Sequence, residues 1–133
     1  DLLIQIQEQK TLSEIIESKG IDAFLKIEED VCASVDVKNH VIATGGSVVY
    51  SKKAMEHLKR IGIVLHLNIA YNELEKRLGS LDDRGVAHRE NQTLKDLYDE
   101  RIPLYKKWCD KEIDVSNLTI EETVRKLVRV VYK

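Results

Sequence analysis

The sequence has little of several residue types, and each shortage removes a class of protein from consideration. It contains 2 cysteines, Cys32 and Cys109, far apart and with no C-x-x-C spacing. This usage predicts reduced thiols in a cytoplasmic protein. The 4 histidines show no ligand spacing, so we expect no metal-binding residues. No apolar run approaches the roughly 20 residues that span a bilayer, and no signal peptide is visible.

The sequence also has no large excess of positive or negative charge. The formal net charge is −2, which predicts no nucleic-acid partner. The composition, 43% hydrophobic and 33% charged over 133 residues, is typical of one globular domain with its own core. We therefore expect a single domain over residues 1–133 that is monomeric and binds no membrane.

Capping patterns and apolar periodicity divide the chain into alternating helices and strands. Thr11 and Glu14 form a capping box, and the same pattern recurs at Thr119. The predicted strands are residues 40–44, 63–67 and 113–115. Alternation of this kind predicts an α/β fold, a three-layer parallel sheet with helices on both faces. Three strands are few for such a sheet, so we expect a domain that lacks its first strand or strands.

The stretch "VIATGGSVV" places Gly45, Gly46 and Ser47 at the end of the first predicted strand. One interpretation is a tight turn. The other is a close approach of the backbone to a ligand, because ligands of parallel α/β sheets bind beyond the carboxyl ends of the strands. Glycine N–H groups at such an end can bind a hydroxyl group or an anion with no β-carbon in the way.

Four arginines form a second group, in and around residues 79–92, which lack periodicity and read as a mobile, lid-like loop. Arginine in a closing loop is suited to phosphoryl transfer, because its planar cation stabilises charge on the transferring oxygens. The alternative is a solvated loop with local Asp–Arg pairs, which contribute little to stability. The four arginines are Arg77, Arg84, Arg89 and Arg101.

In order and spacing, these features resemble the shikimate kinase family of small P-loop kinases over nearly the whole chain. The segment from Leu12 to Glu28 is similar to the family's "S-I-x-E-I-F … G-E-x-x-F-R-x-x-E". "VIATGGSVV" resembles its "VIATGGG" turn, and "ERIPLYKKWCD" resembles its "R-x-P-L-Y-x-x-x-A-D" helix. Arg77 and Arg84, seven residues apart, resemble its nucleotide-contacting and lid arginines, and Asp1 falls where its "D-T-D" ends.

The resemblance implies a P-loop kinase fold and a kinase that uses ATP and Mg²⁺ to phosphorylate a hydroxyl group of a small molecule. Asp1 would be catalytic by orienting or deprotonating that hydroxyl group, and Arg84 would be catalytic as it closes over the phosphates. Arg77 and Arg84 would bind the nucleotide. The implied acceptor-binding residues are Asp1, Gly45, Gly46, Ser47 and Arg101.

Three departures from the family pattern leave alternatives open. The motif G-x-x-x-x-G-K-[ST] is absent, and we expect it upstream of residue 1, which is not Met. Leu25 stands where the family has the arginine that binds the substrate carboxylate, and Ser47 replaces the third glycine. The lid reads "RGVAHRE" instead of "RPLL". The alternatives are a kinase for another small hydroxyl acceptor, with shikimate a poor substrate if Leu25 lies in the site, and a non-catalytic kinase-like binding module.

Overall fold

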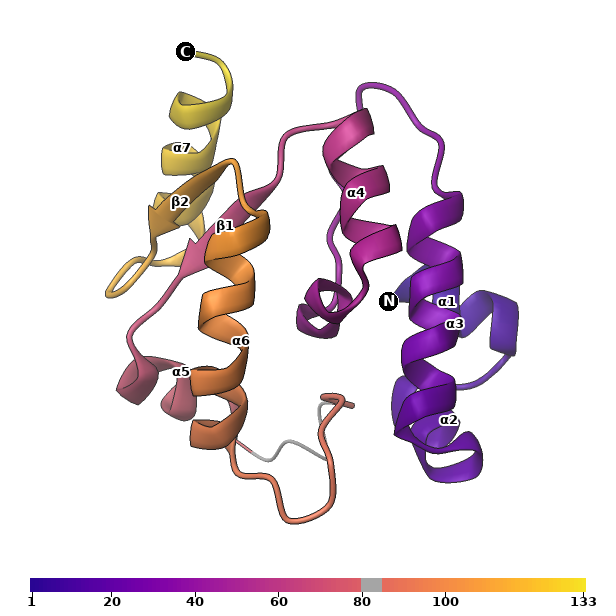
Figure 1. Cartoon of the computed structure of the whole chain (residues 1–133). Helices are drawn as coiled ribbons and strands as arrows, with labels where there is room; N and C mark the ends of the chain where they lie inside the picture. The colour runs from indigo at the N-terminus through magenta and orange to yellow at the C-terminus, as the bar shows by residue number, and fades with distance from the viewer. Residues whose placement is uncertain (80–84) are drawn as a thin grey trace.

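The computed structural model describes residues 1–79 and 85–133, and the chain begins with three helices. They are α1 (Leu2–Glu8), α2 (Leu12–Lys19) and α3 (Ile21–Ser34) (Figure 1). The predicted capping box is confirmed: the Thr11 N–H donates to the Glu14 carboxylate at 2.7 Å, and the Glu14 N–H donates to Thr11 Oγ1 at 3.3 Å. Gly20 then ends α2 with φ of 86°, a conformation that favours glycine.

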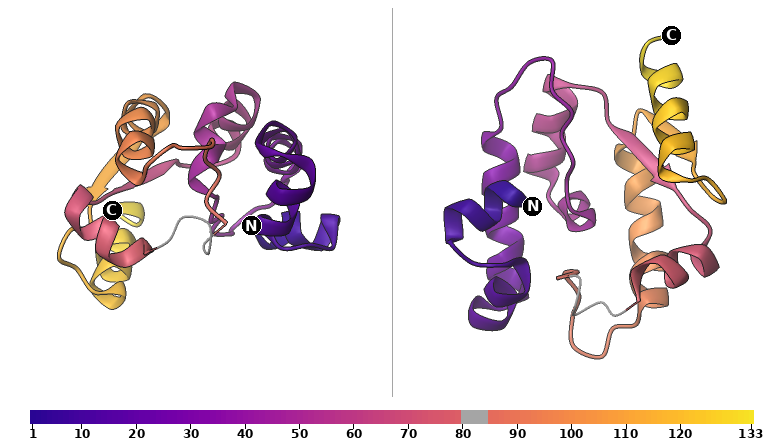
Figure 2. Two further views of the ribbon diagram at one scale, coloured as in Figure 1. Left: turned by 90° about the horizontal axis from the view of Figure 1, so that it is seen from below. Right: turned by 180° about the vertical axis from the view of Figure 1, so that it is seen from behind.

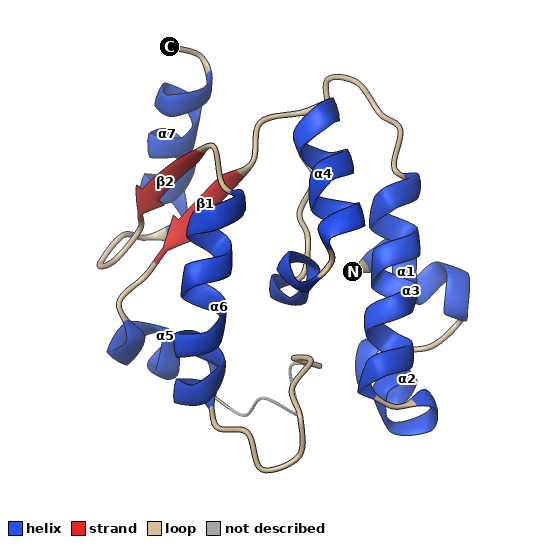
Figure 3. Cartoon of the chain, viewed as in Figure 1, coloured by secondary structure: helices blue, strands red, loops and turns tan. Residues whose placement is uncertain are grey.

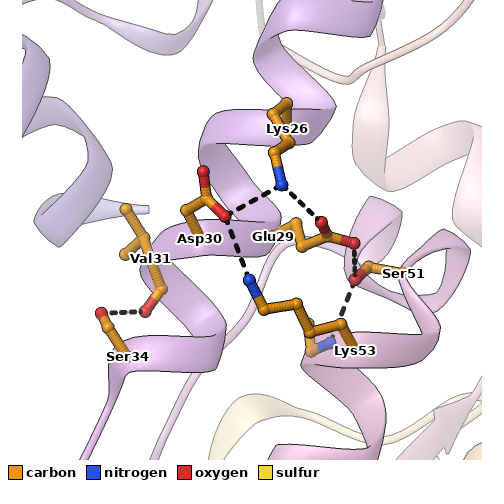
Figure 4. A network of polar contacts seen from close by, with 8 residues as sticks. Lys26, Glu29, Asp30, Val31, Ser34, Ser51 and Lys53 are labelled. Carbon is orange, nitrogen blue, oxygen red and sulfur yellow. Dashed lines mark hydrogen bonds and ion pairs between the residues drawn. The ribbon is translucent and has the colours of Figure 1, made fainter.

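A 3₁₀ helix, η1 (Gly46–Tyr50), leads into α4 (Lys52–Ile61). Ser51 caps α4 by accepting from the Ala54 N–H at 3.0 Å, and its hydroxyl donates to Glu29 of α3 at 2.5 Å. Figure 4 shows how Lys26 and Lys53 surround Asp30 in the same network, at 3.2 and 3.5 Å. The contacts tie the end of η1 to α3 and therefore hold the preceding glycine turn in place.

Two parallel strands form the described sheet. They are β1 (Leu65–Asn68) and β2 (Lys111–Asp114), in the register Leu65 opposite Lys111 (Figure 3). The connection between them holds α5 (Tyr71–Leu78) and α6 (Leu94–Trp108), and α7 (Ile120–Val131) follows β2. Parallel pairing across a helical connection confirms the predicted α/β class. None of the helices in the described part of the chain combines the length and apolar character that a membrane crossing requires.

The prediction of a strand at residues 40–44 is wrong. This segment is not part of a sheet among the described residues, where the sheet has two strands instead of the three expected. Val41 is 98% exposed and Ile42 is 40% exposed. A β-rich sequence becomes a strand only when a neighbour takes up its backbone hydrogen bonds, and no described strand lies beside this one.

The helices lie in two groups around α4. In all the views of Figures 1 and 2, α1–α3 lie on one side of α4, and the sheet with α5–α7 lies on the other. One apolar cluster lies around Ile15 and Phe24, and a second lies around Val48 and Met55, where η1 and α4 meet Cys32 of α3. Both α3 and α6 contact η1. The glycine turn therefore lies where the two groups meet.

Candidate functional site

A cavity of about 250 Å³ lies where α3, η1 and α6 meet. These elements are far apart in the sequence and are brought together by packing around η1. The structure thus gathers all the residues that were predicted to hold an acceptor. The cavity lining includes Asp1, Gly45, Gly46, Ser47 and Arg101.

The two glycines of the turn are explained by the close approach of side chains. Gly45 has φ of −68°, and neither glycine has the positive φ that would require glycine for the backbone alone. A β-carbon at Gly45 would lie 2.9 Å from Glu28 Oε2 and 3.1 Å from Asp1 Oδ1. A β-carbon at Gly46 would lie 2.6 Å from Tyr105 Oη and 3.0 Å from Arg101 Nη1. Side chains of the protein therefore crowd both positions, which explains why both residues are glycine; ligand binding at this turn stays a prediction.

Glu28 is a buried carboxylate in this cavity, and it was not among the predicted site residues. Its side chain is 2% exposed, and its Oε1 accepts a hydrogen bond from Ser47 Oγ at 2.5 Å. Burial raises the pKa of Glu28 above its ordinary value, and the Ser47 hydrogen bond and the charge of Arg101 oppose that rise. The sequence carried a signal for it, because an acid lies among the apolar residues Phe24 and Val31 on one face of α3.

Arg101 is the only arginine or lysine in the described lining of this cavity, and it is 7% exposed. Its Nη2 donates to the carbonyl oxygen of Ala87, and its Nε donates to Tyr50 Oη at 3.3 Å. Its guanidinium carbon lies 5.4 Å from the centre of the Tyr50 ring. The loop after residue 84 and η1 thus both hold the guanidinium group, and its Nη1 lies toward Gly46.

Tyr105, one turn after Arg101 on α6, supports the turn from the same side. Its hydroxyl group donates to the carbonyl oxygen of Gly46 at 3.1 Å. Burial raises the pKa of Tyr105, and the charge of Arg101 opposes that rise. The hydroxyl group therefore stays protonated near neutral pH and remains a donor to the turn.

Asp1 lies at the N-cap position of α1, where an aspartate often has no role beyond capping the helix. Within the described residues, however, its carboxylate makes no capping hydrogen bond to α1. The carboxylate lies instead beside Gly45, on the same side as Glu28. Its position is that of a group facing a ligand, and Asp1 is exposed.

The structure does not bring Arg77 to the cavity. Its guanidinium group pairs with Glu73 one turn earlier on α5 and donates to the carbonyl oxygen of Leu118 at 3.0 Å. Arg84 lies outside the described residues, and the same holds for most of the first half of the predicted lid. Arg89, from the described part of that loop, pairs with Asp22 at 3.0 Å on the surface. The nucleotide-binding roles of Arg77 and Arg84 stay predictions.

Leu25 lines a second cavity of about 210 Å³ beside the first. The two cavities share Ala87 and Leu97 in their linings, and Arg89 belongs to the second. Leu25 is therefore a neighbour of the first cavity and is not part of its lining. Its apolar side chain cannot pair with a ligand carboxylate from there.

The described residues fit the acceptor side of a phosphoryl transfer and not the nucleotide side. The sequence contains no G-x-x-x-x-G-K-[ST] motif to cradle phosphates. Across residues 1–79 and 85–133, no three Asp, Glu, His or Cys side chains are grouped to hold a metal ion.

Parallel α/β architecture, a diglycine turn and a cavity lined by carboxylate and guanidinium groups are typical of proteins that bind a small polar molecule. Comparison with known proteins identifies the family within this class. The chain matches the shikimate kinase family over residues 1–132. It is 32% identical to a shikimate kinase of Caldanaerobacter subterraneus over 136 residues, which cover 100% of this chain and 79% of that protein.

Two further relatives give the same result. A shikimate kinase of Thermodesulfovibrio yellowstonii is 36% identical over 121 residues, covering 89% of this chain and 69% of that protein. One from Clostridium botulinum is 34% identical, covering 98% of this chain and 78% of its own length. The chain belongs to the shikimate kinase family. Membership confirms the predicted P-loop kinase fold class and implies ATP use and a small-molecule substrate.

Proposed function

We propose that the protein transfers the γ-phosphate of ATP, bound with Mg²⁺, to a hydroxyl group of a small molecule held in the 250 Å³ cavity. The observation that carries this proposal is the convergence of Asp1 Oδ1 and Arg101 Nη1 on the two neighbouring glycines of one turn. An acceptor bound there has a carboxylate to take its proton and a fixed cation beside it. The relatives are named for shikimate, which is the first acceptor to test.

Each residue has one task in this proposal. Asp1 orients the acceptor hydroxyl group and takes its proton as the group becomes a nucleophile. Gly45 and Gly46 let the acceptor approach the backbone, and Ser47 fixes that turn through Glu28. Arg101 contacts the acceptor through Nη1, and its two other nitrogens are held by protein oxygens. Such positioning contributes much of the rate of phosphoryl transfer, since there is little covalent work for the protein to do.

Arg84 and Arg77 complete the proposal on the nucleotide side. Arg84 would close over the phosphates and Arg77 would lie near the adenine, as the family resemblance implies. Closure of residues 79–92 over the site would exclude water, which otherwise hydrolyses ATP. The two thiols, Cys32 and Cys109, are both free, which favours a reducing compartment such as the cytoplasm.

The test is a coupled ADP-release assay on the full-length protein with a panel of small alcohols and hydroxy acids that includes shikimate. Asp1→Asn should lower kcat by about 100-fold or more, because general-base catalysis contributes about 10²–10⁴-fold. Asp36→Asn is the matched control, since Asp36 is also an exposed aspartate but lies outside the cavity. Acceptor-independent ADP release, or full activity in Asp1→Asn, would contradict the proposal.

A further inference from the structure

Tyr50 contacts the guanidinium group of Arg101 from outside the acceptor cavity, whose described lining does not include it. Arg101 Nε donates to Tyr50 Oη at 3.3 Å, and the guanidinium carbon lies 5.4 Å from the centre of the tyrosine ring. The tyrosine therefore offers an acceptor oxygen and a π face to the same cation. Together these contacts limit the orientations open to the Arg101 side chain, which is 7% exposed.

Glu100 takes the hydroxyl proton of Tyr50. Tyr50 Oη donates to Glu100 Oε1 at 2.5 Å, and the other oxygen of that carboxylate accepts from Gln92 Nε2 at 3.0 Å. A tyrosine hydroxyl group has one proton, so an oxygen that donates to Glu100 presents its lone pairs to Arg101. Burial raises the pKa of Tyr50, the Glu100 carboxylate adds to the rise, and Arg101 opposes it. The hydroxyl group therefore stays protonated near neutral pH and keeps this arrangement.

The backbone of Tyr50 belongs to the same short segment as the glycine turn. Tyr50 is the last residue of η1, and the two residues before it, Val48 and Val49, are buried at 4% and 5% exposure. Arg101, in contrast, comes from α6. The contact between Tyr50 and Arg101 therefore fixes a cation from one element relative to a turn in another, because the buried valines anchor the tyrosine.

We propose that Tyr50, oriented by Glu100, is a positioning residue that holds the Arg101 guanidinium group in place for the acceptor and thereby raises acceptor affinity. Arg101 Nη1 is the atom that lies toward the turn, 3.0 Å from the place of a β-carbon at Gly46. A long side chain that is already held loses less conformational freedom when a ligand binds to it. The inference rests on the proposed function, because it concerns the acceptor bound in that same cavity.

Tyr50→Phe removes the hydroxyl group and keeps the ring. The coupled ADP-release assay on the full-length protein gives separate KM values for ATP and for the acceptor. The acceptor probe is shikimate, or the compound of the panel that the parent phosphorylates in its place. We expect the acceptor KM to rise about three- to tenfold, the usual effect of one lost hydrogen bond. The KM for ATP and the kcat at saturating acceptor should stay within about twofold, because the lost interaction concerns acceptor binding alone.

Two further variants separate positioning from a general loss of structure. Tyr71→Phe is the matched control, since Tyr71 also donates to a glutamate, Glu75, at 3.2 Å but lies outside the described cavity lining, and it should leave both KM values unchanged. Glu100→Ala should raise the acceptor KM about threefold or more in the parent and add nothing in the Tyr50→Phe background, because Glu100 acts through Tyr50. Additive effects, an unchanged acceptor KM in Tyr50→Phe, or equal rises in both KM values would overturn the proposal.

A second readout needs no turnover. The Nε–H signal of Arg101 in NMR spectra, assigned by its loss in Arg101→Lys, reports how fast that proton exchanges with solvent. Tyr50→Phe should speed the exchange about tenfold or more, because the proton loses its acceptor oxygen, whereas Tyr71→Phe should not change it. A parent that phosphorylates no acceptor refutes the proposed function, and the exchange rates then still decide whether Tyr50 holds Arg101. An active parent whose exchange rate is unchanged in Tyr50→Phe refutes this inference alone.

Discussion

Replacing Gly46 by alanine tests whether the turn is glycine-rich because side chains crowd it. A β-carbon there would lie 2.6 Å from Tyr105 Oη, about 0.8 Å inside the 3.4 Å at which ordinary contact begins, and 3.0 Å from Arg101 Nη1. The Tyr105 ring cannot easily retreat, because its hydroxyl group donates to Gly46 and it packs with Val48 and Val49. Such overpacking costs about 1–3 kcal/mol of unfolding free energy.

Gly62→Ala is the matched control for the loss of a glycine. Gly62 has an extended backbone with φ of −167°, and a β-carbon there would meet no atom closer than 4.0 Å. Restricting the unfolded chain should therefore stabilise this variant by about 0.4–1 kcal/mol. The same gain applies to Gly46→Ala, so the difference between the two variants measures the clash.

The assay is urea unfolding followed by the fluorescence of Trp108, the only tryptophan in the sequence. We expect Gly46→Ala to unfold at lower urea than Gly62→Ala, by an amount equivalent to about 1–3 kcal/mol. Part of that cost should disappear in a Tyr105→Phe background, which lacks the nearest oxygen atom. Equal midpoints for the two glycine variants, or the same cost of Gly46→Ala in both backgrounds, would refute the crowding argument.

Three further perturbations follow from the described contacts. Burial raises the pKa of Glu28 above 4.5, so the parent's unfolding free energy should fall as the pH rises from 4.5 through the raised pKa. In a pH series of thermal melts, Glu28→Gln should lack this fall. A parallel fall in both proteins would contradict the prediction. Thr93→Ala removes a helix cap from α6 and should cost about 1 kcal/mol in urea unfolding, whereas Thr123→Ala, inside α7, should cost less. Arg101→Lys keeps the charge but loses the held fork, and should lower kcat/KM about tenfold or more, with Arg125→Lys as an exposed control at full activity.

Local interactions made much of the fold predictable. The predicted capping boxes at Thr11 and Thr119 both form as hydrogen bonds between residues three apart, which is why the sequence alone locates those helix starts. A proline inside a helix removes a backbone hydrogen bond, yet α6 runs through Pro103 from Leu94 to Trp108. Packing of α6 against η1 and its neighbours outweighs the lost hydrogen bond.

The strand expected at residues 40–44 shows the limit of local pattern. Its β-branched residues favour the extended conformation. A strand forms only beside a partner strand, however, and the tertiary fold determines which segments become neighbours. The structure instead leaves Val41 almost fully exposed. The strands at β1 and β2 were predicted correctly in kind because each does find the other, with boundaries shifted by one or two residues.

The sequence by itself determined the helix starts, the α/β class and the family, because caps, periodicity and ordered motifs are local or sequential properties. Only the tertiary structure decided that Asp1, Glu28 and Arg101 converge on one diglycine turn and that Arg77 is instead held by Glu73 and Leu118. The physical reason is that charge–charge distance and burial depend on how α1, α3 and α6 pack around η1. The spacing of residues along the chain does not predict how these helices pack. That packing makes Glu28 a buried carboxylate in the lining of the cavity.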